Sequence, residues 1–247
     1  MRNAKLWVFG DSFSAPFNTH QNHDGGESAY TKYKKWRGGN FPPIWPQILS
    51  EKLGYELVNF SEGGSCNYKI FNKICDNCNK FENGDMVIVG WTFVTRFRLS
   101  NNHNFVSISY SDVDGQEYWG GSEVIKNIAL NRMENAYVKE IYSFENIIDQ
   151  VCKLNGSNVF YWSADETIIN AETYEFRNKN KYMIPECDRG MLRYLEIRYD
   201  AQTISKETRM DIHDQHFGQI GHEVMADRFH KTLLARNVIN YNTKTLV

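Results

Sequence analysis

The chain has 247 residues, with 28 Lys and Arg against 30 Asp and Glu, so its formal net charge is −2. This length suits one sizeable α/β domain, and the near-neutral charge gives no general attraction to nucleic acid or to anionic lipid. The sequence contains no apolar stretch near the roughly 20 residues of a membrane span, so we expect neither a nucleic-acid nor a membrane partner.

The five cysteines are odd in number and irregularly spaced, which is not the pattern of a disulfide framework. Cys75 and Cys78 form a single C-x-x-C pair without a second pair, and this favours two helical cysteines over a zinc or redox site. The first residues contain no apolar signal segment. We therefore expect a cytoplasmic protein, with association with a virion left open.

In the first half of the chain, short apolar runs alternate with helical patterns. A buried strand is predicted at 5–9, a loop at 17–42, a helix at 43–53 that ends at Gly54, a strand at 56–60, a helix at 67–81 and a strand at 85–90. In the next segment, 106–110 alternates like one arm of a hairpin, and Asp114-Gly115 is a candidate turn for it.

The second half continues the alternation with a long helix over 121–154, a strand at 158–163 and a last helix at 219–236. Alternating strands and helices predict an α/β protein, with a parallel sheet covered by helices on both faces. We find no internal repeat and no linker, so residues 1–247 are predicted to form a single domain with insertions around 17–42, 97–120 and 164–210.

Two short motifs at opposite ends of the chain carry candidate chemistry. Gly10-Asp11-Ser12 follows the first predicted strand, where open α/β sheets bind ligands, although Asp and Ser also serve as ordinary helix caps. Asp214-Gln215-His216 precedes the last helix, and a histidine oriented by a carboxylate can act as the base that a serine hydroxyl needs.

Two further histidines compete with His216 for the role of base. His213 is not followed at the right spacing by a glycine-containing turn, and His222 already lies on the last predicted helix. We therefore predict Ser12 as nucleophile, His216 as base and Asp214 as the residue that orients it.

With these motifs the chain resembles the SGNH hydrolase superfamily, the GDSL-like esterases and lipases. Gly10-Asp11-Ser12 resembles the first block of that family, Asn59 followed five residues later by Gly64 resembles the second, and Asp214-Gln215-His216 resembles the fifth. The resemblance implies a three-layer α/β/α fold with a flavodoxin-like sheet of five parallel strands in the order 2-1-3-4-5. It also implies an oxyanion hole that includes the main-chain N–H groups of Ser12 and Gly64.

The third block departs from the pattern of that family. Gly90 matches, but Thr92 stands where the family has an asparagine that donates to the oxyanion, and Phe93 replaces an aspartate. Thr92 and Asn67 are the two candidates for the missing donor, and we favour Asn67 because an amide reaches further than a hydroxyl.

Trp91 and Arg96 follow the third strand and are candidate substrate-binding residues. Trp91 either forms a pocket wall or packs beneath the site, and Arg96 either binds an anionic group or belongs to a solvated loop. Aromatic residues make up 14% of the chain, which suits core packing or stacking on sugars.

The sequence thus predicts a carboxylic ester hydrolase that acts through an acyl-enzyme on a small-molecule or glycan ester, for example an O-acetyl group on a carbohydrate. A triad with main-chain N–H groups suffices for this chemistry, so no metal and no organic cofactor are expected. An O-acyltransferase on the same scaffold and a non-catalytic carbohydrate-binding or structural module are the alternatives, and the oligomeric state is left open.

Overall fold

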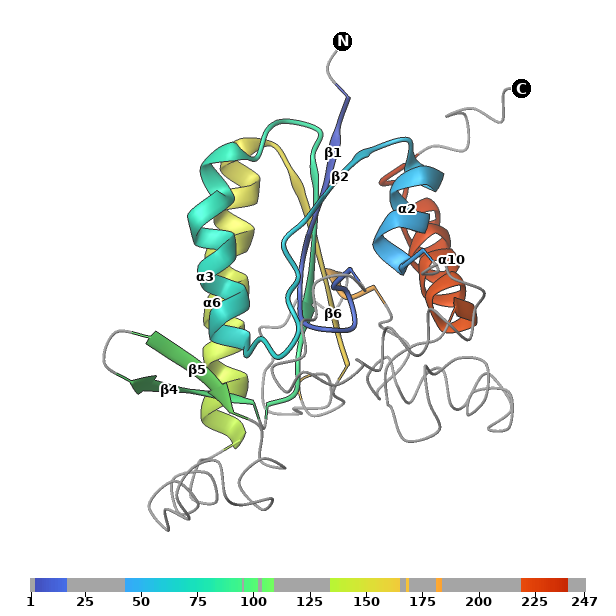
Figure 1. The fold of residues 1–247 in the computed structure, drawn as a ribbon. Helices are drawn as coiled ribbons and strands as arrows, with labels where there is room; N and C mark the ends of the chain where they lie inside the picture. The colour runs from blue at the N-terminus through green and yellow to red at the C-terminus, as the bar shows by residue number, and fades with distance from the viewer. Residues whose placement is uncertain are drawn as a thin grey trace, which may run out of the picture.

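The centre of the protein is a four-stranded parallel sheet, seen between two layers of helices in the computed structural model (Figure 1). The structure describes residues 3–16, 43–94, 96–101, 104–108, 134–164, 168, 181–183 and 219–239. The strands are β1 (Lys5–Phe9), β2 (Glu56–Asn59), β3 (Met86–Trp91) and β6 (Asn158–Ser163). They lie in the order β2-β1-β3-β6, which confirms the predicted α/β fold and the first four positions of the expected order.

A fifth strand is not formed in the part of the chain that the structure describes. Tyr182 makes a single parallel bridge to Tyr161 of β6, and the N–H of Met183 donates to the carbonyl of Tyr161 at 2.8 Å. The short segment 181–183 therefore lies on the free side of β6, at the place where the fifth strand is expected.

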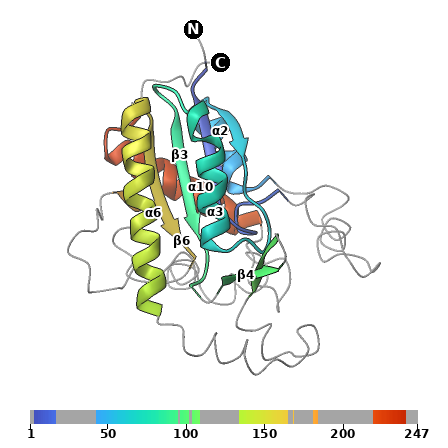
Figure 2. The ribbon, with the colours of Figure 1, turned by 90° about the vertical axis from the view of Figure 1, so that its left-hand side faces the viewer.

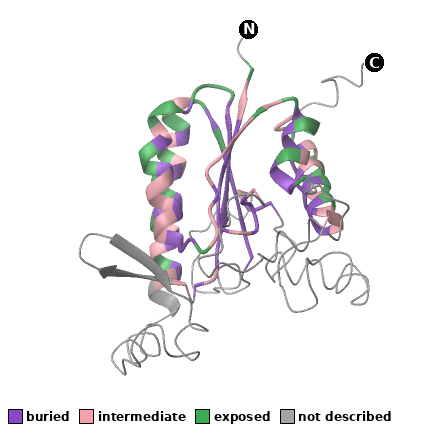
Figure 3. Ribbon diagram, viewed as in Figure 1, coloured by how far each residue is buried: buried purple, intermediate pink, exposed green. Residues whose placement is uncertain are grey.

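Helices cover both faces of the sheet (Figures 1 and 2). On one face lie α2 (Trp45–Leu53) and α10 (Gln219–Ala235), and on the other lie α3 (Asn67–Asn77) and α6 (Glu134–Asn155). A 3₁₀ turn, η2 (Cys78–Lys80), extends α3 to nearly the predicted end. The helices turn their buried sides to the sheet and their exposed sides outward (Figure 3).

The local causes of these helices are visible in the sequence. Gly54 ends α2 in the left-handed conformation, with φ 67°, and Tyr55 N–H then donates to the carbonyl of Ser50. In α10, Met225, Phe229 and Leu233 recur every fourth residue and are fully buried. Burial of each such side chain stabilises the fold by roughly 1.5–3 kcal/mol.

A two-stranded antiparallel ribbon follows β3. It consists of β4 (Phe97–Asn101) and β5 (Asn104–Ile108). The hairpin arm predicted at 106–110 is therefore present in part, and it pairs with the segment before it. Asp114 and Gly115 themselves lie outside the described residues.

The structure bears on two expectations from the sequence, the absence of a membrane-spanning helix and the role of the aromatic residues. No helix in the described ranges combines the length and the apolar character that crossing a bilayer requires. Four of the six tryptophans, namely Trp7, Trp45, Trp91 and Trp162, are buried in the two cores, so core packing accounts for most of the tryptophans.

Candidate active site

The carboxyl ends of β1, β2 and β3 meet at one edge of the sheet. β1 lies between β2 and β3. The chain therefore passes from β1 to its neighbour on one side and then crosses to its neighbour on the other side, which makes β1 the switch point of the sheet. In open α/β sheets, ligands bind in the crevice at such a switch point. Gly10-Asp11-Ser12 follows β1 directly, which places Ser12 at this position.

A tight turn carries Ser12. The N–H groups of Ser14 and Ala15 donate to the carbonyl of Asp11 at 3.1 and 3.0 Å, and the N–H of Phe13 donates to Asp11 Oδ1 at 3.1 Å. Gly10 is required by close packing, because a Cβ there would lie 2.9 Å from Ser14 Oγ. The turn is therefore held from inside by the Asp11 side chain.

Ser12 itself has an unused hydroxyl. Its Oγ is buried and has no hydrogen-bond partner, and no acceptor is assigned to its main-chain N–H within the described part of the chain. Ser14, Ser61 and Ser65 Oγ are likewise buried without a partner among the described residues, so Ser12 is distinguished by its place at the switch point of the sheet and not by the missing partner alone.

The loop after β2 is fastened to the Ser12 turn by Asn59. Its Nδ2 donates to the carbonyl of Ser14 at 2.7 Å, and its Oδ1 accepts the N–H of Ser61 at 2.9 Å. The N–H of Glu62 also donates to the carbonyl of Gly10 at 3.1 Å. The asparagine of the second motif thus joins the loop that leads to Gly64 to the turn that carries Ser12.

Gly64 is exposed and has φ 73°, a conformation that favours glycine. Among the described residues, no acceptor is assigned to its N–H. An N–H group that is unpaired at this edge is available to a ligand.

Glu62 holds the same loop against α3. Its carboxylate pairs with Lys69 Nζ and Lys73 Nζ, each at 2.6 Å. Partial burial alone would raise the pKa of Glu62, but the hydrogen bonds and charges of the two lysines outweigh it and lower the pKa to about 2. The ion pairs are half-exposed, so they position the loop more than they stabilise the fold.

At the end of β3, Thr92 and Asn67 contact each other. Asn67 Nδ2 donates to the carbonyl of Thr92 at 3.0 Å, and the N–H of Thr92 donates to Asn67 Oδ1 at 2.8 Å. The Thr92 hydroxyl donates in turn to Asp11 Oδ2 at 2.6 Å. The two candidates for the third oxyanion donor therefore lie together, and the single hydroxyl hydrogen of Thr92 is already used.

Arg96 reaches back to the same carboxylate. Its Nη1 donates to Asp11 Oδ2 at 2.8 Å and to Thr92 Oγ1 at 3.0 Å. Its guanidinium carbon lies 5.5 Å from the centre of the Phe93 ring. The Asp11 side chain is 2% exposed, so this buried ion pair joins the first and third motifs, and one edge of Arg96 is committed to it.

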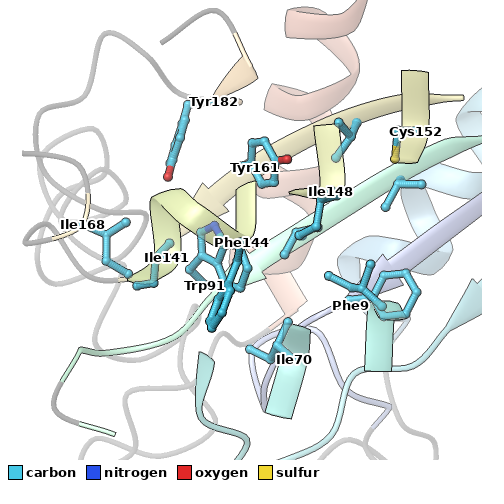
Figure 4. Packing of buried hydrophobic residues seen from close by; sticks show 14 of the residues in the cluster. Phe9, Ile70, Trp91, Ile141, Phe144, Ile148, Cys152, Tyr161, Ile168 and Tyr182 are labelled. Carbon is cyan, nitrogen blue, oxygen red and sulfur yellow. The ribbon is translucent and has the colours of Figure 1, made fainter. Parts of the chain in front are cut away.

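Trp91 packs beneath the site rather than forming a pocket wall. Trp91 lies among the buried residues of this core (Figure 4), is 1% exposed and stacks on Tyr161. Its Nε1 donates to Glu145 Oε1 at 2.8 Å. Of the two sequence interpretations of Trp91, the structure supports packing, because no face of the ring is open to a substrate. We therefore leave Trp91 out of the substrate-binding residues.

The Gly90 of the third motif has a packing reason. A Cβ at Gly90 would lie 2.6 Å from the ring of Trp162 on the neighbouring strand β6, which is too close. Gly90 therefore lets the Trp162 ring lie close against the main chain of β3.

The predicted base and its partner, His216 and Asp214, lie outside the described residues, as does the rival His213. The other rival, His222, is 3% exposed on α10, and its Nδ1 accepts the N–H of Trp45 at 3.3 Å. His222 is therefore engaged inside the fold.

In the described ranges, no group of three or more His, Cys, Asp or Glu side chains could hold a metal ion. Cys75 and Cys78 are free thiols, and Cys78 Sγ donates to the carbonyl of Cys75 at 3.2 Å. Cys75 lies in α3, as predicted, and Cys78 begins the 3₁₀ turn η2 that follows it.

Sequence reasoning missed the connecting roles of three side chains. Asn59 and Asp11 stood inside the recognised motifs, but their partners could not be identified from spacing alone. Glu62 gave a weaker signal, a carboxylate beside two glycines and seven residues before the first of its lysines.

Solved structures similar to this one include protein YxiM from Bacillus subtilis, with TM-score 0.52 and 13% identity; the alignment covers 97% of this chain and 58% of that one. This chain therefore spans 58% of the length of that protein.

A G-D-S-L family lipolytic protein from Desulfitobacterium hafniense has TM-score 0.48 and 13% identity, covering 94% of this chain and 100% of that one. A lipase/acylhydrolase from Enterococcus faecalis has TM-score 0.37 and 11% identity, covering 94% and 96%. No protein-family model matches the chain, and no curated protein does. The similarity to YxiM shows a shared fold.

Proposed function

We propose that the protein is a serine hydrolase that cleaves a carboxylic ester through an acyl-enzyme, with Ser12 as nucleophile. The observation that carries this proposal is the place of Ser12, in a tight turn directly after β1 at the switch point of the sheet, with a hydroxyl that makes no hydrogen bond to the described residues. The turn is held by hydrogen bonds of Asp11 and Asn59, and these bonds fix the position of the Ser12 side chain.

In the proposed mechanism, His216 is the base and Asp214 orients it. Ser12 Oγ attacks the acyl carbon while its proton passes to His216. The tetrahedral intermediate collapses, and the alcohol leaves with that proton. Water then attacks the acyl-enzyme, His216 takes a proton from the water and returns it to Ser12, and the carboxylic acid is released. This route needs no metal and no organic cofactor.

The negative charge on the carbonyl oxygen needs fixed donors. The unpaired N–H groups of Ser12 and Gly64 supply two of them in this proposal. For the third donor we propose Asn67, because its Nδ2 carries two hydrogens and only one is assigned to Thr92. Thr92 is the weaker candidate, since its hydroxyl hydrogen points to Asp11.

For the substrate we propose a short acyl ester, with an O-acetyl group on a carbohydrate as its natural form. Arg96 is proposed to contact the substrate through the edge of its guanidinium group that faces away from Asp11. The burial of four tryptophans leaves Trp36 and Trp119 as the tryptophans that a sugar could meet, and both lie outside the described residues.

The decisive experiment combines covalent labelling and turnover. A fluorophosphonate forms a bond from phosphorus to Ser12 Oγ and releases fluoride, so it labels a working nucleophile. We expect the wild type to be labelled and to hydrolyse 4-nitrophenyl acetate. In Ser12→Ala we expect no labelling and a kcat that is lower by about 10³-fold or more. Ser14→Ala is the matched control, because Ser14 Oγ is also buried without a partner in the same turn. A wild type that is neither labelled nor active would support the non-catalytic alternative.

Product analysis separates hydrolysis from transfer. In the presence of a competing sugar acceptor, a hydrolase releases the free acid, whereas an acyltransferase produces the acylated sugar. An acylated sugar as the main product would replace hydrolase with O-acyltransferase without changing the roles of the residues.

A further inference from the structure

His222 and Trp45 connect the last helix to the first turn of α2. His222 lies in the first turns of α10 and is 3% exposed, and Trp45 is the first residue of α2. The N–H of Trp45 donates to His222 Nδ1 at 3.3 Å. In this contact Nδ1 of His222 is the acceptor, so a substitution that removes the acceptor removes the hydrogen bond.

Trp45 continues the connection to the candidate nucleophile. Its indole Nε1 donates to the carbonyl of Phe13 at 3.1 Å, and Phe13 is the residue after Ser12. The indole is fully buried and packs at 5.1 Å, between ring centres, against Phe229 of α10. Trp45 therefore occupies a fixed place between α10 and the Ser12 turn.

Contacts from three separate elements thus hold the Ser12 turn. Asp11 ties it to Thr92 and Arg96 after β3. Asn59 ties Ser14 to the end of β2. Trp45 ties Phe13 to α10 through His222.

We propose that His222 is a positioning residue: through Trp45 it fixes the Phe13 side of the Ser12 turn, and with it the position of the Ser12 hydroxyl. This inference rests on the proposed function, in which Ser12 is the nucleophile. Without its contact to His222, the first turn of α2 is free to shift, and the indole N–H of Trp45 that holds Phe13 shifts with it. Misplacement of reacting groups by about 1 Å can lower a rate 10²-fold.

The test compares two substitutions of His222 with a control on the same helix. His222→Leu removes the acceptor, while His222→Asn retains one, because Oδ1 of asparagine stands about where Nδ1 of histidine does. Thr232→Val removes a different buried hydrogen bond of α10, from Thr232 Oγ1 to the carbonyl of Met183. All variants are measured well below their melting temperatures, by the rate of fluorophosphonate labelling at Ser12 and by kcat and KM.

We expect His222→Leu to lower the labelling rate and kcat by about 10- to 100-fold with little change in KM, and His222→Asn to recover most of the loss. Thr232→Val should lower only the melting temperature. If His222→Leu does not fold, Trp45→Phe provides the second variant, because it removes the indole N–H to Phe13 and retains an aromatic ring; the same slow labelling is expected.

Three results would overturn the inference. Labelling of His222→Leu or Trp45→Phe at the wild-type rate would leave these residues with a purely structural role. An equal slowing in Thr232→Val would indicate general loosening of α10. A wild type that the reagent does not label would instead refute the proposed function, and the positioning role would fall with it.

Discussion

The side chain of Asn67 and the main chain of Thr92 form a two-way pair, with Nδ2 to carbonyl at 3.0 Å and N–H to Oδ1 at 2.8 Å. The pair resembles the exchange of hydrogen bonds between two strands, and it fixes the start of α3 to the end of β3. An amide held in this way has little freedom, so its second Nδ2 hydrogen has a defined direction. A rigid donor of this kind can stabilise a transition state without reorganising.

We predict that Asn67→Ala lowers kcat by about 10²-fold with little change in KM, because one oxyanion donor is lost. Asn67→Asp is expected to lower kcat similarly, since it retains an acceptor for the Thr92 N–H but has no amide hydrogens. Steady-state kinetics and melting temperature are measured together. A lowered melting temperature with intact kcat in Asn67→Ala would leave Asn67 as a structural residue only.

Thr92→Val is predicted to lower stability more than kcat, the opposite of Asn67→Ala. It removes the donor to Asp11 Oδ2, which then retains Arg96 as its partner, so we expect a stability loss of about 1–3 kcal/mol and less than a tenfold change in kcat. Thr92→Ser retains the hydroxyl and serves as the control. A kcat loss near 10²-fold in Thr92→Val, absent in Thr92→Ser, would transfer the donor role to Thr92.

His216→Ala is predicted to be as damaging as Ser12→Ala, and the double variant no worse than either one. Residues that act as one unit lose their contribution together, so their effects are not additive. The measurement is kcat for the two single variants and the double variant on 4-nitrophenyl acetate. His213→Ala should retain most of the activity; an inactive His213→Ala with an active His216→Ala would move the base to His213.

The decrease of the melting temperature at acid pH should depend in part on Glu62. Its pKa is lowered to about 2 from the ordinary value of 4.5, so between these values the unfolded chain binds more protons. The contribution of Glu62 is therefore complete above about pH 4.5 and is lost as the pH falls toward 2. We expect the melting temperature of Glu62→Gln to fall less steeply over this range than that of the wild type.

The control for this titration is Glu51→Gln. Glu51 is an exposed glutamate of α2, and no ion pair involving it is present in the described part of the chain. Its pH profile should follow the wild type. The expected difference for Glu62→Gln is modest, because the Glu62 side chain is 47% exposed and solvent screens its ion pairs. Parallel profiles for all three proteins would show that Glu62 is not coupled to folding.

Local patterns determined most of the framework. The apolar runs at 5–9 and 158–163 became β1 and β6 with the predicted bounds, and Gly54 ended α2 as expected. Such elements follow from residues that are neighbours in the chain, because apolar spacing and cap conformations act over a few residues. The position of Gly10-Asp11-Ser12 at the carboxyl edge follows for the same reason, since a strand and its continuation are adjacent by construction.

Contacts across the chain depended on the tertiary structure alone. Asp11 meets Arg96 over 85 positions, and Trp45 meets His222 over 177, and no local spacing encodes either contact. The ribbon of β4 and β5 shows the same limit: the extended arm predicted at 106–110 only overlaps β5, and the pairing of β5 with residues 97–101 was not predicted. The physical reason is that strand register and layer packing place these residues together, and both depend on the whole core forming at once.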